Sequence, residues 1–178
     1  MQRLLIGTYI FLMGFGSFDP DVIYNRIEYL ASGLECRVIF LDHLSILLSG
    51  LDGDERRMID STMTRLRSLV ERTGITLYLV SHLRRSNSDS NSHEEGGRVS
   101  LGQLRGSHSI SQISDTVIAL ERDQQSEDSN NITTVRVLKN RYSGEVGVAT
   151  RLTYDLSTTN FYETTKDEQP EFDPTVDF

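Results

Sequence analysis

Two short apolar runs, each followed by polar residues, constrain the fold more than any other feature of this sequence. Arg37–Leu41 and Ile75–Val80 are nearly continuous hydrophobic segments of strand length. This pattern is typical of strands that are buried on both faces of a parallel sheet. A helix is predicted before each run, between Asp19 and Gly33 and over Asp54–Thr73. The order helix, strand, helix, strand with short connections predicts an α/β fold with right-handed crossovers.

Local signals at the ends of both helices support this prediction. Asp19 is a preferred capping residue and Pro20 suits the first helical turn, and Gly33 marks the end of that helix. The second helix is followed by Gly74, again a common stop signal. Its expected inner face repeats with helical period and consists of Ile59, Met63, Leu66 and Val70.

The rest of the chain predicts a third strand, a hairpin and two polar segments. The third strand is Asp115–Leu120, and the hairpin joins Thr133–Leu138 to Val146–Tyr154. Ser107–Ser114 is expected to form a short helix. The polar loop Ser86–Gly97 lies inside the expected domain, where such loops usually serve a function or lack a fixed structure. Residues 1–16 form an atypical N-terminus, 17–165 the domain, and 166–178 an acidic tail without fixed structure.

Composition narrows the classes of protein that remain. The net charge of −8 argues against a generic nucleic-acid coat protein, so any nucleic-acid contact must be local. The single cysteine, Cys36, rules out an internal disulfide framework and fits a reducing cytoplasm. The histidines and this cysteine lack zinc-ligand spacing.

The apolar stretch Leu4–Phe18 is interrupted by glycines and is too short for a membrane span. We favour an irregular or strand-like N-terminus over a signal peptide, because no small-residue cleavage site follows.

Polar side chains come directly after both apolar runs. Asp42 follows the first run, and Ser81 and His82 follow the second. Ligands of open α/β sheets bind at the carboxyl ends of the strands. An aspartate there is the Walker B arrangement, in which it helps to hold the magnesium that bridges nucleotide phosphates, and His82 is placed to sense a γ-phosphate. The simpler alternatives are a capping role for Asp42 and a surface position for His82.

Two further groups of basic residues lie near predicted turns. Arg105 precedes a glycine and an expected helix start, where backbone N–H groups favour anions. Lys139 and Arg141 lie at the hairpin turn. An arginine supplied by a neighbouring subunit accelerates phosphoryl transfer by about 10³–10⁵-fold. Taken alone, each group is better explained by solvated turn residues, so the order of all these features decides the interpretation.

In that order, the features resemble the helicase domain of short-tailed-phage primase–helicases, with Twinkle and DnaB-type helicases as more distant relatives. The segments that carry the resemblance are Val38–Ser45, Asp54–Asp60, Val80–Leu83, His93–Gly96, Leu104–Ser107, Gln112–Arg122 and Val137–Gly144. The resemblance implies a RecA-like P-loop NTPase core, a mostly parallel sheet with flanking helices and a C-terminal hairpin. It also implies a homo-hexameric ring that binds ATP or dTTP with Mg²⁺ between subunits and single-stranded DNA in its centre.

The same resemblance assigns roles to individual residues. Asp42 is the expected magnesium aspartate, His82 the γ-phosphate sensor and Arg141 the arginine finger. Nucleotide contacts are expected from Arg122, Lys139 and Tyr154. DNA contacts are expected from Arg84, Arg85, Arg98 and Arg105. The acidic tail, which ends in Phe178, resembles helicase tails that dock on the replicative DNA polymerase, although a solubilising tail explains it equally well.

One part of the family's machinery is missing from the printed sequence. The phosphate loop Gly-x-x-x-x-Gly-Lys-Ser/Thr does not occur, because the only lysines, Lys139 and Lys166, do not follow a glycine. We expect a domain that lacks the Walker A strand–loop–helix, through a split gene, an internal start or a truncated reading frame. Such a chain would hydrolyse no NTP alone and would need an upstream polypeptide.

Two other functions are compatible with these features. One is a non-catalytic RecA-like interaction module that binds the polymerase or a helicase partner, and the other is a recombinase of the same fold. For the favoured helicase, the expected location is the cytoplasm of a phage-infected bacterium, without membrane contact.

Overall fold

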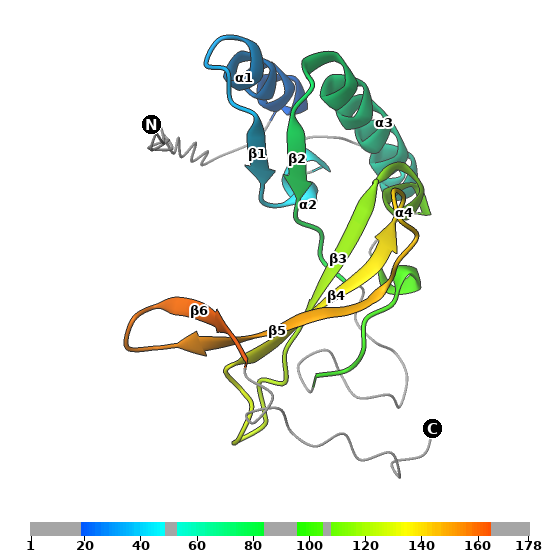
Figure 1. The fold of residues 1–178 in the computed structure, drawn as a ribbon. Coiled ribbons are helices and arrows are strands. Elements are labelled where there is room, and N and C mark those ends of the chain that lie inside the picture. The colour runs from blue at the N-terminus through cyan, green and yellow to red at the C-terminus, as the bar shows by residue number, and fades with distance from the viewer. Residues whose placement is uncertain (1–18, 49–52, 84–95, 105–107, 165–178) are drawn as a thin grey trace, which may run out of the picture.

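The computed structural model describes residues 19–48, 53–83, 96–104 and 108–164 (Figure 1). The helices are α1 (Pro20–Ser32), α2 (Leu44–Leu48), α3 (Glu55–Thr73), α4 (His108–Ile113) and the 3-10 turn η1 (Leu101–Gln103). The strands are β1 (Val38–Leu41), β2 (Thr76–Leu79), β3 (Thr116–Glu121), β4 (Ile132–Asn140), β5 (Gly147–Asp155) and β6 (Asn160–Glu163). No helix among these residues is long and apolar enough to cross a membrane.

The predicted helix–strand–helix–strand unit is confirmed. β1 and β2 pair in parallel, in register from Val38 opposite Thr76 to Leu41 opposite Leu79. The side chain of Asp19 accepts a hydrogen bond from the Asp21 amide at the start of α1. Asp54 caps α3 in the same way, and α3 ends at Gly74 in the left-handed conformation, which glycine adopts without steric cost.

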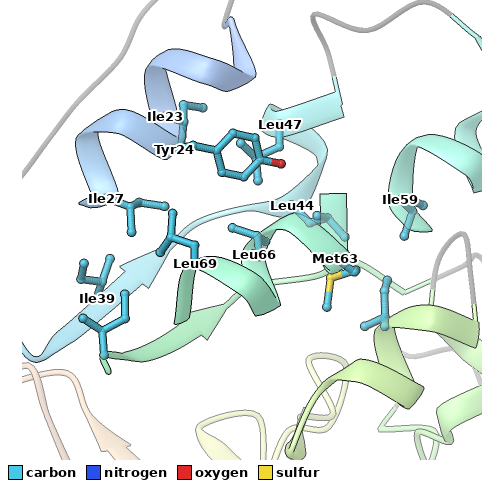
Figure 2. Packing of buried hydrophobic residues seen from close by; sticks show 12 residues of the cluster. Ile23, Tyr24, Ile27, Ile39, Leu44, Leu47, Ile59, Met63, Leu66 and Leu69 are labelled. Carbon is cyan, nitrogen blue, oxygen red and sulfur yellow. The ribbon is translucent and has the colours of Figure 1, made fainter. Parts of the chain in front are cut away.

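The hydrophobic core lies where α1, α2 and α3 meet β1 and β2 (Figure 2). Leu47 of α2 and Ile59 of α3 are its most completely buried large side chains. The inner face of α3 includes Ile59, Met63 and Leu66 as predicted, but Leu69 is buried while Val70 is only partly so. The shift by one residue follows from the 3.6-residue period, which leaves neighbouring positions nearly equivalent at the edge of the buried face.

The prediction that β1 and β2 are buried on both faces is wrong for the described residues. Ile39 points into the core, whereas Phe40 of β1 and Tyr78 of β2 are exposed. Their rings stack on each other with centroids 4.6 Å apart. The physical reason is that the described helices pack against one face of this pair only, as the cluster of buried residues shows.

The second sheet is antiparallel, with strand order β3-β4-β5-β6. The third strand and the predicted hairpin are confirmed as β3 and as β4–β5. Among the described strands only β1 and β2 run parallel. The described sheets therefore contain fewer parallel strands than the mostly parallel sheet that was predicted. β6 was not predicted. It returns after a turn in which the Asp155 carboxylate accepts hydrogen bonds from Ser157 and Thr158.

Candidate active site

The parallel pairing of β1 and β2 brings their carboxyl ends to one edge. Leu41 accepts a hydrogen bond from the Val80 amide at 3.0 Å, and Val80 in turn accepts one from the Leu44 amide at 2.9 Å. The exit from β1 is therefore tied to the exit from β2. Asp42 and His82 follow these exits, and both are exposed at the same edge. The predicted placement of the two residues at one rim agrees with the structure.

Asp42 is available to a ligand at this rim. Among the described residues its carboxylate has no hydrogen-bond or ion-pair partner, and the Leu44 amide that starts α2 is bound by Val80 instead. A capping role for Asp42 is therefore not what the structure shows. The peptide bond that joins Asp42 to His43 is cis.

His43 belongs to the rim although no sequence pattern singled it out. Its ring meets the ring of His82 edge to face, with centroids 4.4 Å apart and planes at 64°. The Nδ1 atom of His43 is buried without a hydrogen-bond partner among the described residues. His82 thus rests against a partly buried imidazole. The one signal in the sequence was the position of His43 directly after Asp42.

Arg141 lies at a second location, just past the end of β4. Its Nη1 atom is 3.0 Å from the Oδ1 atom of Asp115, and its Nη2 atom donates to the Gln112 carbonyl at 2.6 Å. The Arg141 amide also donates to the Asp115 carbonyl at 2.8 Å. The side chain of Arg141 keeps 45% of its surface exposed. The arginine is held in place at the surface and is not packed into the core.

Lys139 occupies a structural position beside Arg141. Its ammonium donates to the carbonyls of Ser111, Gln112 and Ser114, at 2.6, 3.1 and 2.7 Å. A cation at the carboxyl end of a helix satisfies carbonyls that lack partners within the helix. Burial, and then the charge of Arg141, lower the pKa of Lys139. The nucleotide contact expected for Lys139 would require it to leave this cap of α4.

Arg122 and Tyr154 lie at the opposite end of the antiparallel sheet. Glu121 pairs with Thr134, and Thr153 pairs with Ile132, so Arg122 and Tyr154 flank the start of β4. Arg122 is exposed, and the Tyr154 ring lies against Phe161 with centroids 4.9 Å apart.

The two ends of this sheet are too far apart to share one small ligand. β4 has nine residues, and a strand rises about 3.3 Å per residue, so Arg141 lies roughly 25–30 Å from Arg122 and Tyr154. A single nucleotide therefore cannot contact both groups within one chain.

Arg98 is exposed on a segment that is fastened to the sheet. The neighbouring Val99 amide donates to the Oε1 atom of Glu121 at 2.9 Å, and the Nε atom of Arg136 reaches both oxygens of Glu121, at 2.8 and 3.0 Å. Sequence reasoning missed this ion pair, because isolated charges in strands also suit exposed positions. The other expected contact residues lie outside the described residues: Arg84, Arg85, Arg105 and Phe178.

No group of three or more histidine, cysteine, aspartate or glutamate residues in the described part of the chain is arranged to hold a metal. A single exposed carboxylate such as Asp42 nevertheless suits Mg²⁺, which keeps several waters and takes further ligands from substrate phosphates.

Comparison with solved structures identifies the fold. The fold is that of RecA-like ATPases. One solved structure, an ATPase domain, superposes with a TM-score of 0.62 at 20% identity, covering 82% of this chain and 51% of that one. A KaiC-like protein, PH0186 from Pyrococcus horikoshii OT3, gives a TM-score of 0.57 at 13% identity, covering 83% of this chain and 58% of that one.

The sequence comparison identifies the family. The DnaB-like helicase C-terminal domain matches residues 8–163, and the chain belongs to that family. The DNA helicase/primase of Enterobacteria phage T3 is 42% identical over 145 residues, which are 81% of this chain. The chain spans about a quarter of the length of that relative, 25%.

Proposed function

We propose that this chain is part of a replicative DNA helicase that couples NTP hydrolysis to translocation on single-stranded DNA and to duplex unwinding. Membership of the DnaB-like family supports the class of protein. The observation that carries the proposal is the position of Arg141, which is held at the surface and lies a whole strand length from Arg122 and Tyr154. Such an arginine serves a nucleotide held by another copy.

On this proposal the nucleotide site is assembled from two chains. One copy contributes Asp42 and His82 from the rim of β1 and β2, and Tyr154 and Arg122 contact the base end of a nucleotide. The neighbouring copy contributes Arg141. Heterologous contacts of this kind form a ring when the rotation between neighbouring copies closes, and a homo-hexamer is the proposed ring.

Each rim residue has a distinct task in phosphoryl transfer. Mg²⁺, when bound, neutralises the charge that spreads over the phosphate oxygens. Asp42 is exposed and would help to hold this ion at the rim. His82 donates a hydrogen bond toward the γ-phosphate, and the packed ring of His43 limits the orientations of His82. ATP or dTTP is the proposed substrate.

The phosphate loop must come from a segment outside the printed residues. The sequence contains no Gly-Lys pair, so the 178 residues alone are proposed to hydrolyse no NTP. The exposed stack of Phe40 on Tyr78 supports packing by such a segment, because parallel strands are normally covered on both faces.

Other partners follow from the family resemblance. Single-stranded DNA is proposed to contact Arg98, together with Arg84, Arg85 and Arg105. The acidic tail with Phe178 is proposed to dock on the replicative polymerase, in the cytoplasm of the infected bacterium. If the tail docks there, removing 175–178 abolishes polymerase binding and leaves the fold intact.

The test is DNA-stimulated NTP hydrolysis by the chain mixed with a polypeptide that supplies the phosphate loop. Arg141→Ala should lower kcat by about 10³-fold or more, the usual contribution of an arginine finger. Arg26→Ala is the matched control, because Arg26 is an exposed arginine of α1. This variant should leave kcat unchanged.

Absence of hydrolysis in every mixture would favour the second candidate, a non-catalytic interaction module, which the missing phosphate loop also suits. Robust hydrolysis by the chain alone that is lost in Arg141→Ala would overturn the claim that it is inactive alone.

A further inference from the structure

We infer that Asp115 is the positioning residue for Arg141, and that it links the hairpin turn to helix α3. The inference rests on the proposed function, because it assigns a role in a reaction that Arg141 is proposed to assist. It names no new contact with the nucleotide.

Asp115 and Arg141 are joined through both their side chains and their backbones. The carboxylate Oδ1 atom of Asp115 accepts from Nη1 of Arg141 at 3.0 Å, and the Asp115 carbonyl accepts from the Arg141 amide at 2.8 Å. Gln112, three residues earlier, accepts from the other terminal nitrogen. Charge-assisted bonds to a planar guanidinium are directional as well as strong. The geometry therefore fixes the direction in which Arg141 leaves the turn.

The Asp115 carboxylate is itself fixed from the other side. Its Oδ2 atom accepts from Nη1 of Arg67 at 2.7 Å, and Nε of Arg67 donates to Glu71 at 2.7 Å within α3. The Asp115 side chain is 29% exposed, so solvent screens these pairs less than it screens fully exposed ones. With one oxygen on α3 and the other on Arg141, the carboxylate cannot rotate without breaking a charged contact.

This arrangement leaves Arg141 able to act while it is held. A guanidinium has five N–H donors, and the described contacts of Arg141 use its two terminal nitrogens once each. The remaining donors are available to an incoming phosphate. A side chain held before the ligand arrives loses less conformational entropy on binding. Asp115 thus prepares Arg141 for the reaction without competing for all of its donors.

The charged neighbours of this cluster do not offer Arg141 another anchor. Lys139 repels it and is bound to the carbonyls of Ser111, Gln112 and Ser114. Glu71 is bound to Arg67. Asp115 is therefore the carboxylate that holds Arg141 among the residues that the structure describes.

The first test measures hydrolysis in the mixture that contains the phosphate-loop polypeptide. Asp115→Asn keeps the shape but removes the charge, and we expect kcat to fall by about 10–100-fold, the usual cost of a misplaced catalytic group. KM for the NTP should change less than about threefold, because the finger acts mainly in the transition state. Glu71→Gln is the matched control: it touches the same arginine, Arg67, but not Asp115, and should leave kcat unchanged.

The second test reads the position of Arg141 without any activity. In the 178-residue chain, ¹⁵N NMR of the guanidinium groups should show slowed rotation of the Arg141 group in the wild type and in Glu71→Gln. Asp115→Asn should raise the rotation rate of the Arg141 group clearly, because the charge-assisted bond is lost and the Gln112 carbonyl still holds only one terminal nitrogen. If Asp115→Asn does not fold, Arg67→Gln removes only the anchor on α3 and should increase the rotation rate by a smaller factor.

The two tests separate this inference from the proposed function. Unchanged kcat and unchanged guanidinium rotation in Asp115→Asn, with a large loss in Arg141→Ala, would overturn the positioning role alone. If instead Arg141→Ala has no effect on kcat, the proposed finger is wrong. The NMR result would then still decide whether Asp115 holds Arg141.

Discussion

The buried ion pair between Glu121 and Arg136 gives a sharp prediction for stability. The two side chains are 6% and 17% exposed, and Glu121 also accepts from the Val99 amide. In Glu121→Gln, Arg136 keeps its charge but loses its ionic partner. Losing one partner of a buried pair costs about 3–5 kcal/mol. Because water reaches part of Arg136, and the new amide oxygen still accepts from Val99, we expect roughly 2–3 kcal/mol here.

Urea unfolding of the chain, followed by far-ultraviolet circular dichroism, measures this loss as a lower midpoint at constant slope. The double variant Glu121→Gln with Arg136→Met removes both charges and keeps an acceptor for the Val99 amide. It should recover at least half of the lost free energy, since no buried charge is then left without a partner. The reasoning is refuted if Glu121→Gln costs less than about 0.5 kcal/mol, the range of ordinary surface substitutions. It is refuted equally if the double variant is no more stable than Glu121→Gln.

Three further predictions concern the core, the cap of α4 and the β5–β6 turn. Leu47→Ala should lower the free energy of unfolding by about 3–5 kcal/mol in the same assay, because Leu47 is fully buried, and a loss below about 1 kcal/mol would contradict the assigned core. Lys139→Met should cost about 1–3 kcal/mol, because the carbonyls of Ser111 and Ser114 lose this donor while that of Gln112 keeps its bond to Arg141. Unchanged stability with a raised KM for the NTP would instead support the nucleotide contact. Hydrogen bonds from the side chains of Ser157 and then Thr158 lower the pKa of Asp155 from 3.8 to about 2. The contribution of these hydrogen bonds to stability is complete above the unfolded pKa and is lost as the pH falls through about 2. The carboxyl ¹³C shift of Asp155 should therefore titrate at about pH 2. A midpoint at the ordinary aspartate pKa of about 3.9 would contradict the turn.

The sequence predicted the elements whose local chemistry is strong. The capping residue Asp19, the glycine stops and the apolar period of α3 each act over a few residues, so they can be recognised without the fold. The placement of Asp42 and His82 at one rim followed from strand direction alone. The hairpin was found because its strands alternate around a polar turn, whereas β6 was missed because its turn depends on side-chain bonds of Asp155.

What the sequence could not predict depends on contacts between distant residues. The exposed face that carries Phe40 depends on which segments cover β1 and β2. The capping position of Lys139 depends on α4, which ends at Ile113, far earlier in the chain. Asp115 and Arg67 are 48 positions apart, and no local pattern relates them. The catalytic, nucleotide and DNA roles of the named residues remain predictions that rest on the resemblance and the geometry.

The most direct test of the shared site is a mixing experiment. Asp42→Asn and Arg141→Ala chains, each supplied with the phosphate loop, are assayed for DNA-stimulated hydrolysis alone and after mixing in equal amounts. If Asp42 and Arg141 act on one nucleotide from different copies, each variant is inactive alone. Random assembly of a ring then restores about a quarter of the sites, because an intact Asp42 meets an intact Arg141 at that fraction of head-to-tail interfaces. Mixtures that stay as inactive as the separate variants would contradict the account.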